Sequence, residues 1–467
     1  MESVQRDGKA GTNLGYHFDG GQIRQKQAQQ KQVLQQRALE MHFQPITSVR
    51  RGSVVGVEAL VRAQDASGQA VSPEQLFHQA QQQNCLRELD ERCQSLALET
   101  FAPLHQIAPE LLLFVNVHPV SVAHLSKTSV SFLHTQAALY HIDPRNLAVE
   151  ILERRIPSTE GLQKAVAHYR ESGFLVVLDD MGAGDSNLDR VTQVQPDIIK
   201  VDRSLIYGIA DDCFKQEVFK ALVQLSERIG GWVITEGIET RDDALTCLDS
   251  GGDLLQGYYL GRPQTLPREG EAARAALRRG DDHARHTGVA FRQRAIEKAV
   301  RERHARDERF QVVRHLRETL EHTAPEAVEE VLYQASLESA LFESACVLDK
   351  EGVQLTDTVL AHGSSERQKS VIYAPPAKGS DHSLKEYVYL LMEMPLHEFE
   401  TQPYVPLPNT DLCVTITARY HAPDAEERIL CMHLLVARGV LQSDAVPQHL
   451  DTDSPEMPRR HDEGVPQ

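Results

Sequence analysis

Short apolar runs recur through the first half of the chain, and longer stretches with the composition of helices separate them. From His42 onward these runs are SVVGVEAL, LLLFVNV, LAVEIL, FLVVLDD, IIKV, WVITEGI and DLLQGYYL. Strands that alternate with helices predict a parallel sheet covered by helices. Because so many of these units lie before Pro267, we expect a closed α/β barrel rather than an open sheet.

The N-terminal residues have a different character. Residues 1–21 are polar and rich in glycine, and QIRQKQAQQKQVLQQRALE follows with good helix formers. This pattern predicts a disordered tail and then a helix. We therefore expect the barrel domain, with its N-terminal helix, to span residues 22–267.

After Pro267 the composition changes again. Residues 268–321 are rich in Arg and Ala and contain no proline, which predicts a helical linker over 268–324. Phe310, Val313, Leu316 and Leu320 recur at steps of three and four residues and form an apolar stripe. This stripe either docks within the chain, which we favour, or pairs with a second chain.

Residues 325–440 predict a smaller α+β domain. EAVEEVLYQASLESALFE has a helical composition, and SACVLDKEGVQL, EYVYLLMEM, LCVTITARY and ILCMHLLVA are strand candidates. The segment DKEG lies between two apolar runs and indicates a hairpin. Residues 441–467 are rich in Asp, Pro and Ser and predict a disordered tail.

Length and charge narrow the class of protein. At 467 residues, two domains are the ordinary expectation. A formal net charge of −18 argues against binding to DNA or RNA polymers. The sequence has no apolar stretch long enough to cross a bilayer and no signal peptide, so we expect a cytoplasmic protein without membrane contact. The seven cysteines are scattered and never spaced as CxxC, which favours free buried thiols.

Polar residues with ligand chemistry follow the apolar runs. Each is expected where its strand ends: Glu58, Asn116, Glu150, Asp179, Asp180, Lys200, Glu236 and Gln256. In an α/β barrel the carboxyl ends of the strands meet at one mouth, where the loops build the active site. These side chains are therefore expected to form one site, although a single strand-end carboxylate such as Glu150 is more often a helix N-cap.

Several carboxylates in one mouth repel each other unless cations lie between them. Carboxylate and amide oxygens favour hard divalent cations, so we expect Mg²⁺ or Mn²⁺ rather than Zn²⁺. The adjacent pair Asp179 and Asp180 would allow two ions, which together stabilise a phosphoryl displacement. The glycines of DDMGAGD either close a tight loop or give a mobile loop beside the ions.

The order of these motifs resembles a known family. QPI, GVEALVR, FVNVHP, VEILER, LDDMGAGDSN, PDIIKVDRSLI, TEGIET and LLQGYYLGRP occur in order over about residues 39–267. This half of the chain resembles the EAL family of cyclic di-GMP phosphodiesterases. The resemblance implies a modified (β/α)8 TIM-like barrel whose first strand runs against the others. It also implies hydrolysis of cyclic di-GMP to linear pGpG.

The resemblance also implies roles for individual residues. Glu58, Asn116, Glu150 and Asp179 would hold the first metal, and Asp179, Asp180 and Glu236 the second. Lys200 would orient the attacking water, Glu236 is an alternative general base, and Glu58 counts among the catalytic residues. Substrate contacts are implied for Leu60, Arg62, Asp180 and Gln256. Glu153 and Glu239 would hold the loop after Asp180 without touching the ions.

Two features leave alternatives open. The family usually has DDFGTGYSS, whereas this chain has Met181, Ala183, Asp185 and Asn187 at the changed positions. A catalytically weak or inactive barrel that serves as a cyclic di-GMP receptor, or a protein-interaction scaffold, is therefore the alternative to an enzyme. The C-terminal domain weakly resembles PAS-like or Cache-type sensors, which implies an unknown ligand or protein there and control of the activity. The alternative is a packing or dimerisation module without a small-molecule ligand, and we expect a homodimer.

Overall fold

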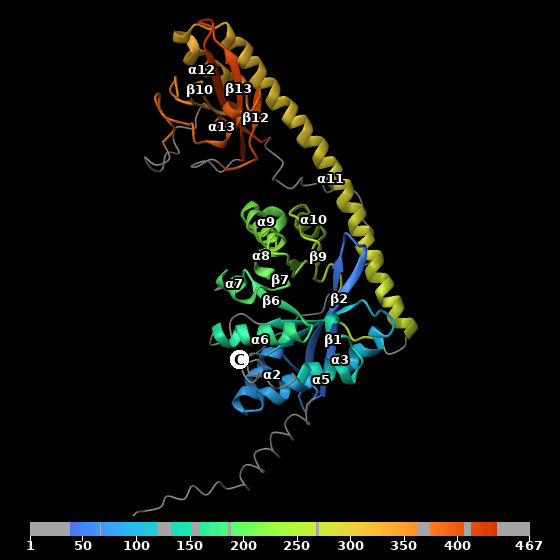
Figure 1. Cartoon of the computed structure of the whole chain (residues 1–467). Helices are drawn as coiled ribbons and strands as arrows, with labels where there is room; N and C mark the ends of the chain where they lie inside the picture. Colours follow the sequence, from blue (N-terminus) through green and yellow to red (C-terminus); the bar gives the residue numbers. More distant parts are fainter. Residues whose placement is uncertain are drawn as a thin grey trace, which may run out of the picture. The chain divides into compact units, whose positions relative to one another are not determined.

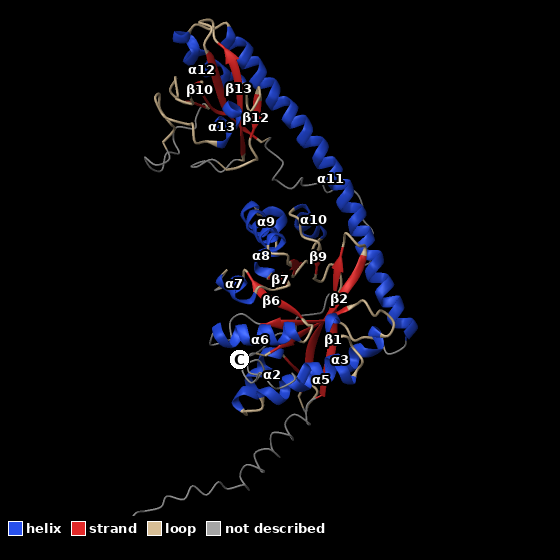
Figure 2. Cartoon of the chain, viewed as in Figure 1, coloured by secondary structure: helices blue, strands red, loops and turns tan. Residues whose placement is uncertain are grey.

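The computed structural model describes residues 38–65, 67–118, 132–151, 159–184, 188–267, 270–361, 374–405 and 412–436. Both expected tails and residues 22–37 of the expected N-terminal helix lie outside these residues. The last three residues of that expected helix, Ala38, Leu39 and Glu40, belong instead to a β-strand, because they pair with a second strand. The chain divides into two compact units, residues 1–295 and 296–467. Figures 1 and 2 show the elements of each unit.

The first unit alternates strands with helices, as the apolar runs predict. Its strands are β1 (Ala38–Ser48), β2 (Ser53–Gln64), β3 (Ala70–Val71), β4 (Leu112–Val117), β5 (Leu147–Ile151), β6 (Leu175–Met181), β7 (Ile198–Val201), β8 (Trp232–Thr235) and β9 (Leu254–Leu255). Its helices are α2 (Pro73–Gln82), α3 (Leu86–His105), α5 (Phe132–Leu139), α6 (Thr159–Glu171), α7 (Asp189–Val194), α8 (Arg203–Ile206), α9 (Cys213–Arg228), α10 (Arg241–Asp249) and the first part of α11 (Gly270–Glu321).

The strands close into a barrel. Within the described ranges the sheet runs β1-β9-β8-β7-β6-β5-β4-β2-β3, and an additional β1–β2 pairing closes it, so eight strands form the barrel and β3 is an appendage of β2. β1 is antiparallel to β2 and to β9, whereas β2 and β4 to β9 pair in parallel with one another. The TIM-like barrel with a reversed first strand is therefore confirmed.

Two apolar layers hold this barrel together. Buried side chains of the helices and the outer strand faces form one large core, which includes Leu98, Phe101 and Phe219. A smaller cluster fills the barrel interior: Ile46, Phe114, Ala148, Val177, Ile198, Ile234 and Leu254. Gly56 of β2 leaves room for Phe114, because an added Cβ would lie 2.8 Å from the Phe114 ring. The interior is therefore packed rather than open.

The second unit contains a five-stranded antiparallel sheet in the described residues, in the order β11-β10-β14-β13-β12. Its strands are β10 (Phe342–Asp349), β11 (Val359–Leu360), β12 (Glu398–Glu400), β13 (Cys413–His421) and β14 (Glu427–Leu435), and its helices are the end of α11, α12 (Val328–Glu338) and α13 (Glu386–Glu393). One sheet face packs against α11 and α12 and the other against α13.

Two expectations for this unit have definite outcomes. The stripe Val313, Leu316 and Leu320 is buried in the core of the second unit, so it docks within the chain. The expectation that EYVYLLMEM forms a strand is wrong. This segment forms helix α13, whose buried residues Val388 and Leu391 are three positions apart. Its apolar residues contact the sheet on one side only, and this one-sided burial fits the helical period.

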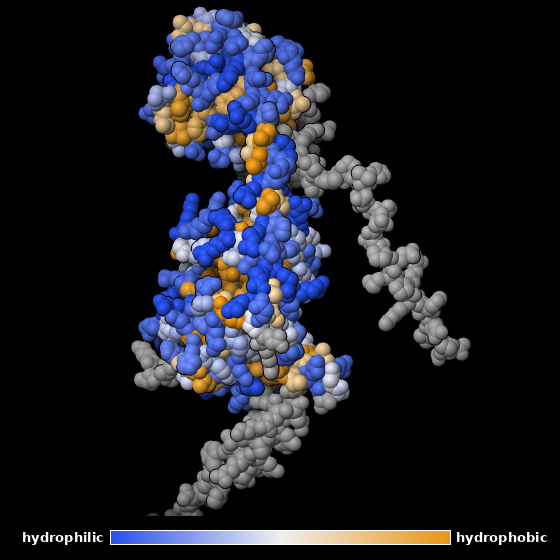
Figure 3. All heavy atoms as spheres, turned by 90° about the vertical axis from the view of Figure 1, so that its right-hand side faces the viewer, coloured by the Kyte–Doolittle hydropathy of each residue, from blue (hydrophilic) through white to orange (hydrophobic). Residues whose placement is uncertain are grey.

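In the described part of the chain, no helix is both long and apolar enough to cross a bilayer. The face in Figure 3 is predominantly polar, with scattered apolar residues.

Candidate active site

A layer of polar residues lies directly above the apolar layer of the barrel interior. Side chains of a strand alternate between its two faces, so a residue two positions after an inward apolar residue also points inward. Asn116, Glu150, Asp179, Lys200, Glu236 and Gln256 each follow a member of the interior cluster by two residues. Glu58 follows Gly56 in the same way. One alternating pattern therefore gathers the predicted residues at one end of the barrel.

Lys200 lies at the centre of this layer. Its Nζ atom is 2.6 Å from Glu236, 2.8 Å from Glu150, 3.2 Å from Glu58 and 3.6 Å from Asp179. The side chain is 1% exposed, so no solvent screens these contacts effectively. The predicted carboxylates of β2, β5 and β6, and the one that directly follows β8, are thus within reach of one ammonium group.

Glu58 connects Lys200 with the amide side chains of Gln256 and Asn116. Its carboxylate accepts hydrogen bonds from Gln256 Nε2 at 2.6 Å and from Asn116 Nδ2 at 3.2 Å. The expectation that Glu58 ends its strand is wrong, because β2 continues to Gln64 while pairing with the long strand β1 and with β3. The inward direction of Glu58 is set by the alternation of β2 and not by the end of the strand.

Gln44 completes the layer, and the sequence reasoning missed it. Gln44 in β1 pairs with Glu58 in register, and its Oε1 accepts a hydrogen bond of 3.2 Å from Gln256. Since β1 is antiparallel, the inward residue at this level precedes Ile46 by two positions instead of following it. The quoted motif QPI contained Gln44, and the reversed direction of the first strand was the signal that could have identified it.

Asp179 and Asp180 both reach the site although they are neighbours. Asp180 has a φ of +59°, in the left-handed region, and the register between β6 and β7 shifts between Leu178 and Met181. This irregularity interrupts the strand alternation. Carboxylate oxygens of Asp179, Asp180 and Glu236 lie within 4.8 Å of one another. Three hard oxygen donors at this spacing fit a divalent cation.

The carboxylates of the layer outnumber its one ammonium group, that of Lys200. Glu150 is fully buried, and its Oε2 has no hydrogen-bond partner in the described residues. Burial raises the pKa of Glu150 well above its ordinary value, and the charge of Glu58 adds to this shift. Burial also works against the charge of Lys200, but the surrounding carboxylates, Asp179 first, hold the Lys200 pKa well above 10.5. These donors therefore fit bound metal.

The pKa values of Glu236 and Glu58 are shifted in opposite directions. Burial raises the pKa of Glu236 from 4.5 to about 8, and Asp179 and Glu58 push it the same way. Burial opposes the charge of Glu58 too, but Lys200 and the hydrogen bonds from Gln256 and Asn116 lower its pKa. The metal-free site therefore holds a proton more tightly on Glu236 than on Glu58.

The stability of the metal-free protein is predicted to fall as pH rises from about 5 to about 8.5. The folded chain keeps a proton on Glu236 up to about pH 8, whereas the unfolded chain releases it near 4.5, so alkali favours unfolding in this window. We expect the melting temperature in EDTA to drop by roughly 5 °C or more. Saturating Mn²⁺ should remove this drop, since bound metal stabilises the ionised carboxylates. A melting temperature in EDTA that is flat across this range would contradict the prediction.

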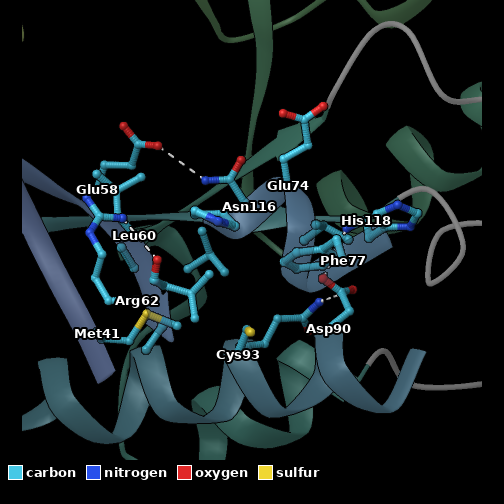
Figure 4. A pocket seen from close by; sticks show the side chains of 17 residues that line it. Met41, Glu58, Leu60, Arg62, Glu74, Phe77, Asp90, Cys93, Asn116 and His118 are labelled. Atoms are coloured by element: carbon cyan, nitrogen blue, oxygen red, sulfur yellow. Dashed lines mark hydrogen bonds between the residues drawn. The ribbon is translucent and has the colours of Figure 1, made fainter. Parts of the chain in front are cut away.

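A cavity of about 380 Å³ adjoins the polar layer. Glu58, Leu60, Arg62 and Asn116 line it, together with residues of α2 and α3 (Figure 4). The Arg62 guanidinium donates a hydrogen bond of 3.0 Å to the carbonyl of Val61. A volume of this size falls in the range of small-molecule sites. The predicted substrate contacts Leu60 and Arg62 thus line a cavity next to the predicted metal ligands.

The remaining predicted residues are less central. Glu239 forms an ion pair of 2.8 Å with Arg203, at the start of α8. The neighbouring Ser204 hydroxyl donates to the carbonyl of Gly182, in the loop after Asp180. Glu153, Asp185 and Asn187 lie outside the described residues, so their predicted roles stay predictions.

Comparisons with known proteins place the first unit in a known domain family. Residues 26–263 match the model of the EAL domain family. PdeB of Escherichia coli K12, described as a probable cyclic di-GMP phosphodiesterase, is 26% identical over 237 residues, which make up 51% of this chain and 44% of that protein. The cyclic di-GMP phosphodiesterase RocR of Pseudomonas aeruginosa is 26% identical over 226 residues, or 48% of this chain and 57% of that protein. The chain therefore spans about half the length of these relatives.

Among solved structures, the Bacillus subtilis protein YkuI has a similar fold over both units. Its crystal structure, which has an EAL domain and contains the substrate c-di-GMP and calcium, superposes with a TM-score of 0.63 at 22% identity. The superposition covers 85% of this chain and 94% of YkuI. At this identity, the likeness shows the fold.

Proposed function

Because this chain belongs to the EAL domain family, we propose that it is a metal-dependent phosphodiesterase that hydrolyses cyclic di-GMP to linear pGpG. The observation that carries the proposal is the polar layer at the barrel mouth. There the carboxylates of Glu58, Glu150, Asp179 and Glu236 surround Lys200 beside a cavity of about 380 Å³. A site with this surplus of negative charge is suited to cations and, through them, to phosphate.

The donor set supports two cations. Glu58, Asn116, Glu150 and Asp179 would hold one, and Asp179, Asp180 and Glu236 the other; the latter three already have oxygens within 4.8 Å of one another. Mg²⁺ and Mn²⁺ suit these oxygen donors. When bound, the ions would supply Lewis acidity and charge neutralisation for the displacement at phosphorus.

The chain's own residues would carry out the proton transfer and the positioning. Water would attack the phosphorus of one phosphodiester, and the bond to the leaving ribose oxygen would break. Lys200 would orient the water and offset charge, while Glu236 in its ionised form is the alternative proton acceptor. The leaving oxygen would end as a hydroxyl, which gives linear pGpG.

Substrate contacts would come from the rim of the cavity. Arg62 would grip a phosphate with its fork of donors, and Leu60 would pack against the ligand. Gln256 is held by Glu58 and Gln44, so its amide would be fixed in one orientation toward substrate or water. Asp180 would contact the substrate as well as a cation.

The decisive experiment incubates the purified full-length protein with cyclic di-GMP and resolves the products by chromatography. We expect turnover to pGpG with Mg²⁺ or Mn²⁺ and none in EDTA. Binding without turnover in either metal would instead support the receptor alternative, to which the altered residues Met181 and Ala183 point. Neither binding nor turnover would support a scaffold.

We also propose that the C-terminal unit tunes this activity, with an unknown ligand or protein, in a homodimer. Support comes from α11, whose residues Ala273 and Leu277 pack in the barrel core and whose residues Val313 and Leu316 pack in the second core. Arg309 and Arg317 further join α11 to Glu400 and Glu398 of β12, each at 3.0 Å. A single helix thus contributes to both cores.

Removal of residues 325–467 tests this regulation. We expect the turnover number to change by at least about threefold, or the oligomeric state to change, since α11 would lose the packing that orders its end. The double variant Glu398→Gln/Glu400→Gln should shift the rate in the same direction. An unchanged rate and an unchanged mass in light scattering would count against the proposal.

A cytoplasmic location is likewise our proposal. Its support is that each of the seven cysteines, all of which lie in the described residues, is a free thiol. Cell fractionation with a cytoplasmic marker would test it, and recovery with an extracytoplasmic marker would overturn it.

A further inference from the structure

Another cavity, of about 280 Å³, lies between the start of α11 and the outer face of the barrel. Its lining is mostly apolar and comes from both sides: Phe43, Pro45, Val54, Val57, Leu104 and Leu260 from the barrel, and Ala273, Ala276 and Leu277 from α11. Asp281 of α11 accepts a hydrogen bond of 2.9 Å from the backbone N–H of Val54. Gly280 allows this close approach, because an added Cβ would lie 2.5 Å from the Val54 side chain. The helix is thus held against β2 beside the cavity.

This cavity lies directly behind the polar layer, on the other side of the barrel wall. Pro45 and Val57 pair across β1 and β2, one position away from the pair Gln44 and Glu58. Neighbouring residues of a strand point to opposite faces, so the first pair borders the cavity while the second points into the barrel. The amide of Gln44 also donates a hydrogen bond of 3.1 Å to the carbonyl of Gly261, which lines the cavity. A ligand in the cavity would therefore press on the strands that carry two members of the polar layer.

Two side chains of α11 add nitrogen donors to this apolar lining. Arg279 and His283 are four residues apart, so they share one face of the helix, and both line the cavity. The His283 ring packs edge-on against Tyr259, and its buried Nε2 atom has no hydrogen-bond partner in the described residues. Arg279 is exposed, and in the same part of the chain its guanidinium has neither an ion-pair nor a hydrogen-bond partner. Since none of the described lining residues is acidic, an anionic group would meet donors here and no like charge.

We propose that this cavity binds a medium-chain monocarboxylate and that the bound ligand raises the activity of the polar layer. The apolar lining suits a hydrocarbon chain, and Arg279 with His283 suits a carboxylate head. An apolar cavity of roughly 150 Å³ holds one benzene molecule, so nearly twice that volume suits a chain of about eight carbons. A ligand that fills the space behind Gln44 and Glu58 restrains both strands. The effect on activity, unlike the binding, rests on the proposed function.

Isothermal titration calorimetry of the full-length protein with octanoate tests the site. We expect one octanoate per chain with a Kd of roughly 10 µM to 1 mM, and no binding of acetate, which carries the charge without the chain. Arg279→Gln removes the guanidinium and should raise this Kd at least about fivefold. Ala276→Phe fills the cavity and should abolish binding. Arg278→Gln, at the adjacent exposed residue outside the cavity, is the matched control and should leave the Kd unchanged.

The effect on the polar layer is measured as kcat/KM for cyclic di-GMP in Mn²⁺, with and without saturating octanoate. We expect octanoate to raise kcat/KM at least about twofold in the wild-type protein and in Arg278→Gln, and to leave it unchanged in Ala276→Phe. Octanoate should also raise the melting temperature of the first two proteins, since it binds the folded chain. If the larger side chain at position 276 disturbs folding, the exposed Arg279→Gln still provides the comparison.

The outcomes distinguish this inference from the proposed function. If octanoate does not bind, or binds the wild-type protein, Arg279→Gln and Ala276→Phe equally, the site is overturned, and any turnover of cyclic di-GMP leaves the function standing. If octanoate binds as expected but kcat/KM stays the same or falls, the effect on the polar layer is overturned. Octanoate binding by a protein that does not hydrolyse cyclic di-GMP would keep the site and overturn the proposed function, together with the effect on activity.

Discussion

Replacing Glu58 with alanine is expected to lower kcat/KM for cyclic di-GMP by about 10³-fold or more. The variant loses a metal donor, and it loses the carboxylate that links the residues of the polar layer to one another. The Glu58 carboxylate contacts Lys200 at 3.2 Å, Gln256 at 2.6 Å and Asn116 at 3.2 Å. Without it, the amide of Gln256 has only Gln44 to fix its direction within the layer. The measurement is the rate of pGpG formation at saturating Mn²⁺.

Two further variants make the Glu58 result specific. Glu58→Gln keeps the shape of the side chain but removes its charge, so a comparable loss would assign the effect to the carboxylate. Glu227→Ala, on the exposed side of α9, should keep the wild-type rate. A Glu58→Ala protein that retains more than a tenth of wild-type activity would remove Glu58 from the metal site.

Replacing Lys200 with methionine is expected to abolish measurable turnover and to destabilise the metal-free protein by about 3–5 kcal/mol at pH 8. Methionine fills a similar volume but leaves Glu150, Glu236 and their neighbours without the ammonium that lies 2.6–2.8 Å from them. At pH 6 the loss should be smaller, because these carboxylates then take up protons. Urea unfolding at both pH values, with EDTA or Mn²⁺, measures the effect.

Lys164→Met is the matched control for Lys200. Lys164 pairs with Glu160 at 2.5 Å on the surface of α6, where both side chains are more than half exposed. Surface pairs of this kind contribute little to stability, so urea unfolding should not change measurably. Equal stability of the Lys200→Met variant and the wild-type protein in EDTA would contradict the central role of this ammonium.

The fold was predictable because the apolar runs and the polar residues that follow them share the two-residue period of a β-strand. An inward residue of the barrel interior, such as Val177 or Ile198, is followed two positions later by Asp179 or Lys200. Alternation along a strand requires both to face the same interior. Apart from Gln44, the members of the polar layer could therefore be predicted without any knowledge of the loops.

The misses have equally definite causes. Gln44 was missed because its strand runs in the opposite direction. The inward polar residue of that strand therefore precedes the inward apolar residue by two positions, whereas in the other strands it follows. The end of β2 was predicted too early, at Glu58, because pairing with β1 extends the strand to Gln64. α13 was mistaken for a strand because residues such as Tyr387 and Val388 favour extended structure locally, and the packing of one face against the sheet overrides that preference.

The reversed first strand also decides where the polypeptide enters the barrel. In an ordinary barrel of this class the chain arrives at the end opposite the catalytic mouth, but here Ala38 pairs with Gln64, beyond Arg62 on β2. Residue 38 therefore lies at the end of the barrel that holds the polar layer, and the described part of the chain begins beside the candidate site. A module joined directly to residue 38 would consequently stand next to the polar layer, whereas in a barrel with an ordinary first strand it would stand at the opposite end.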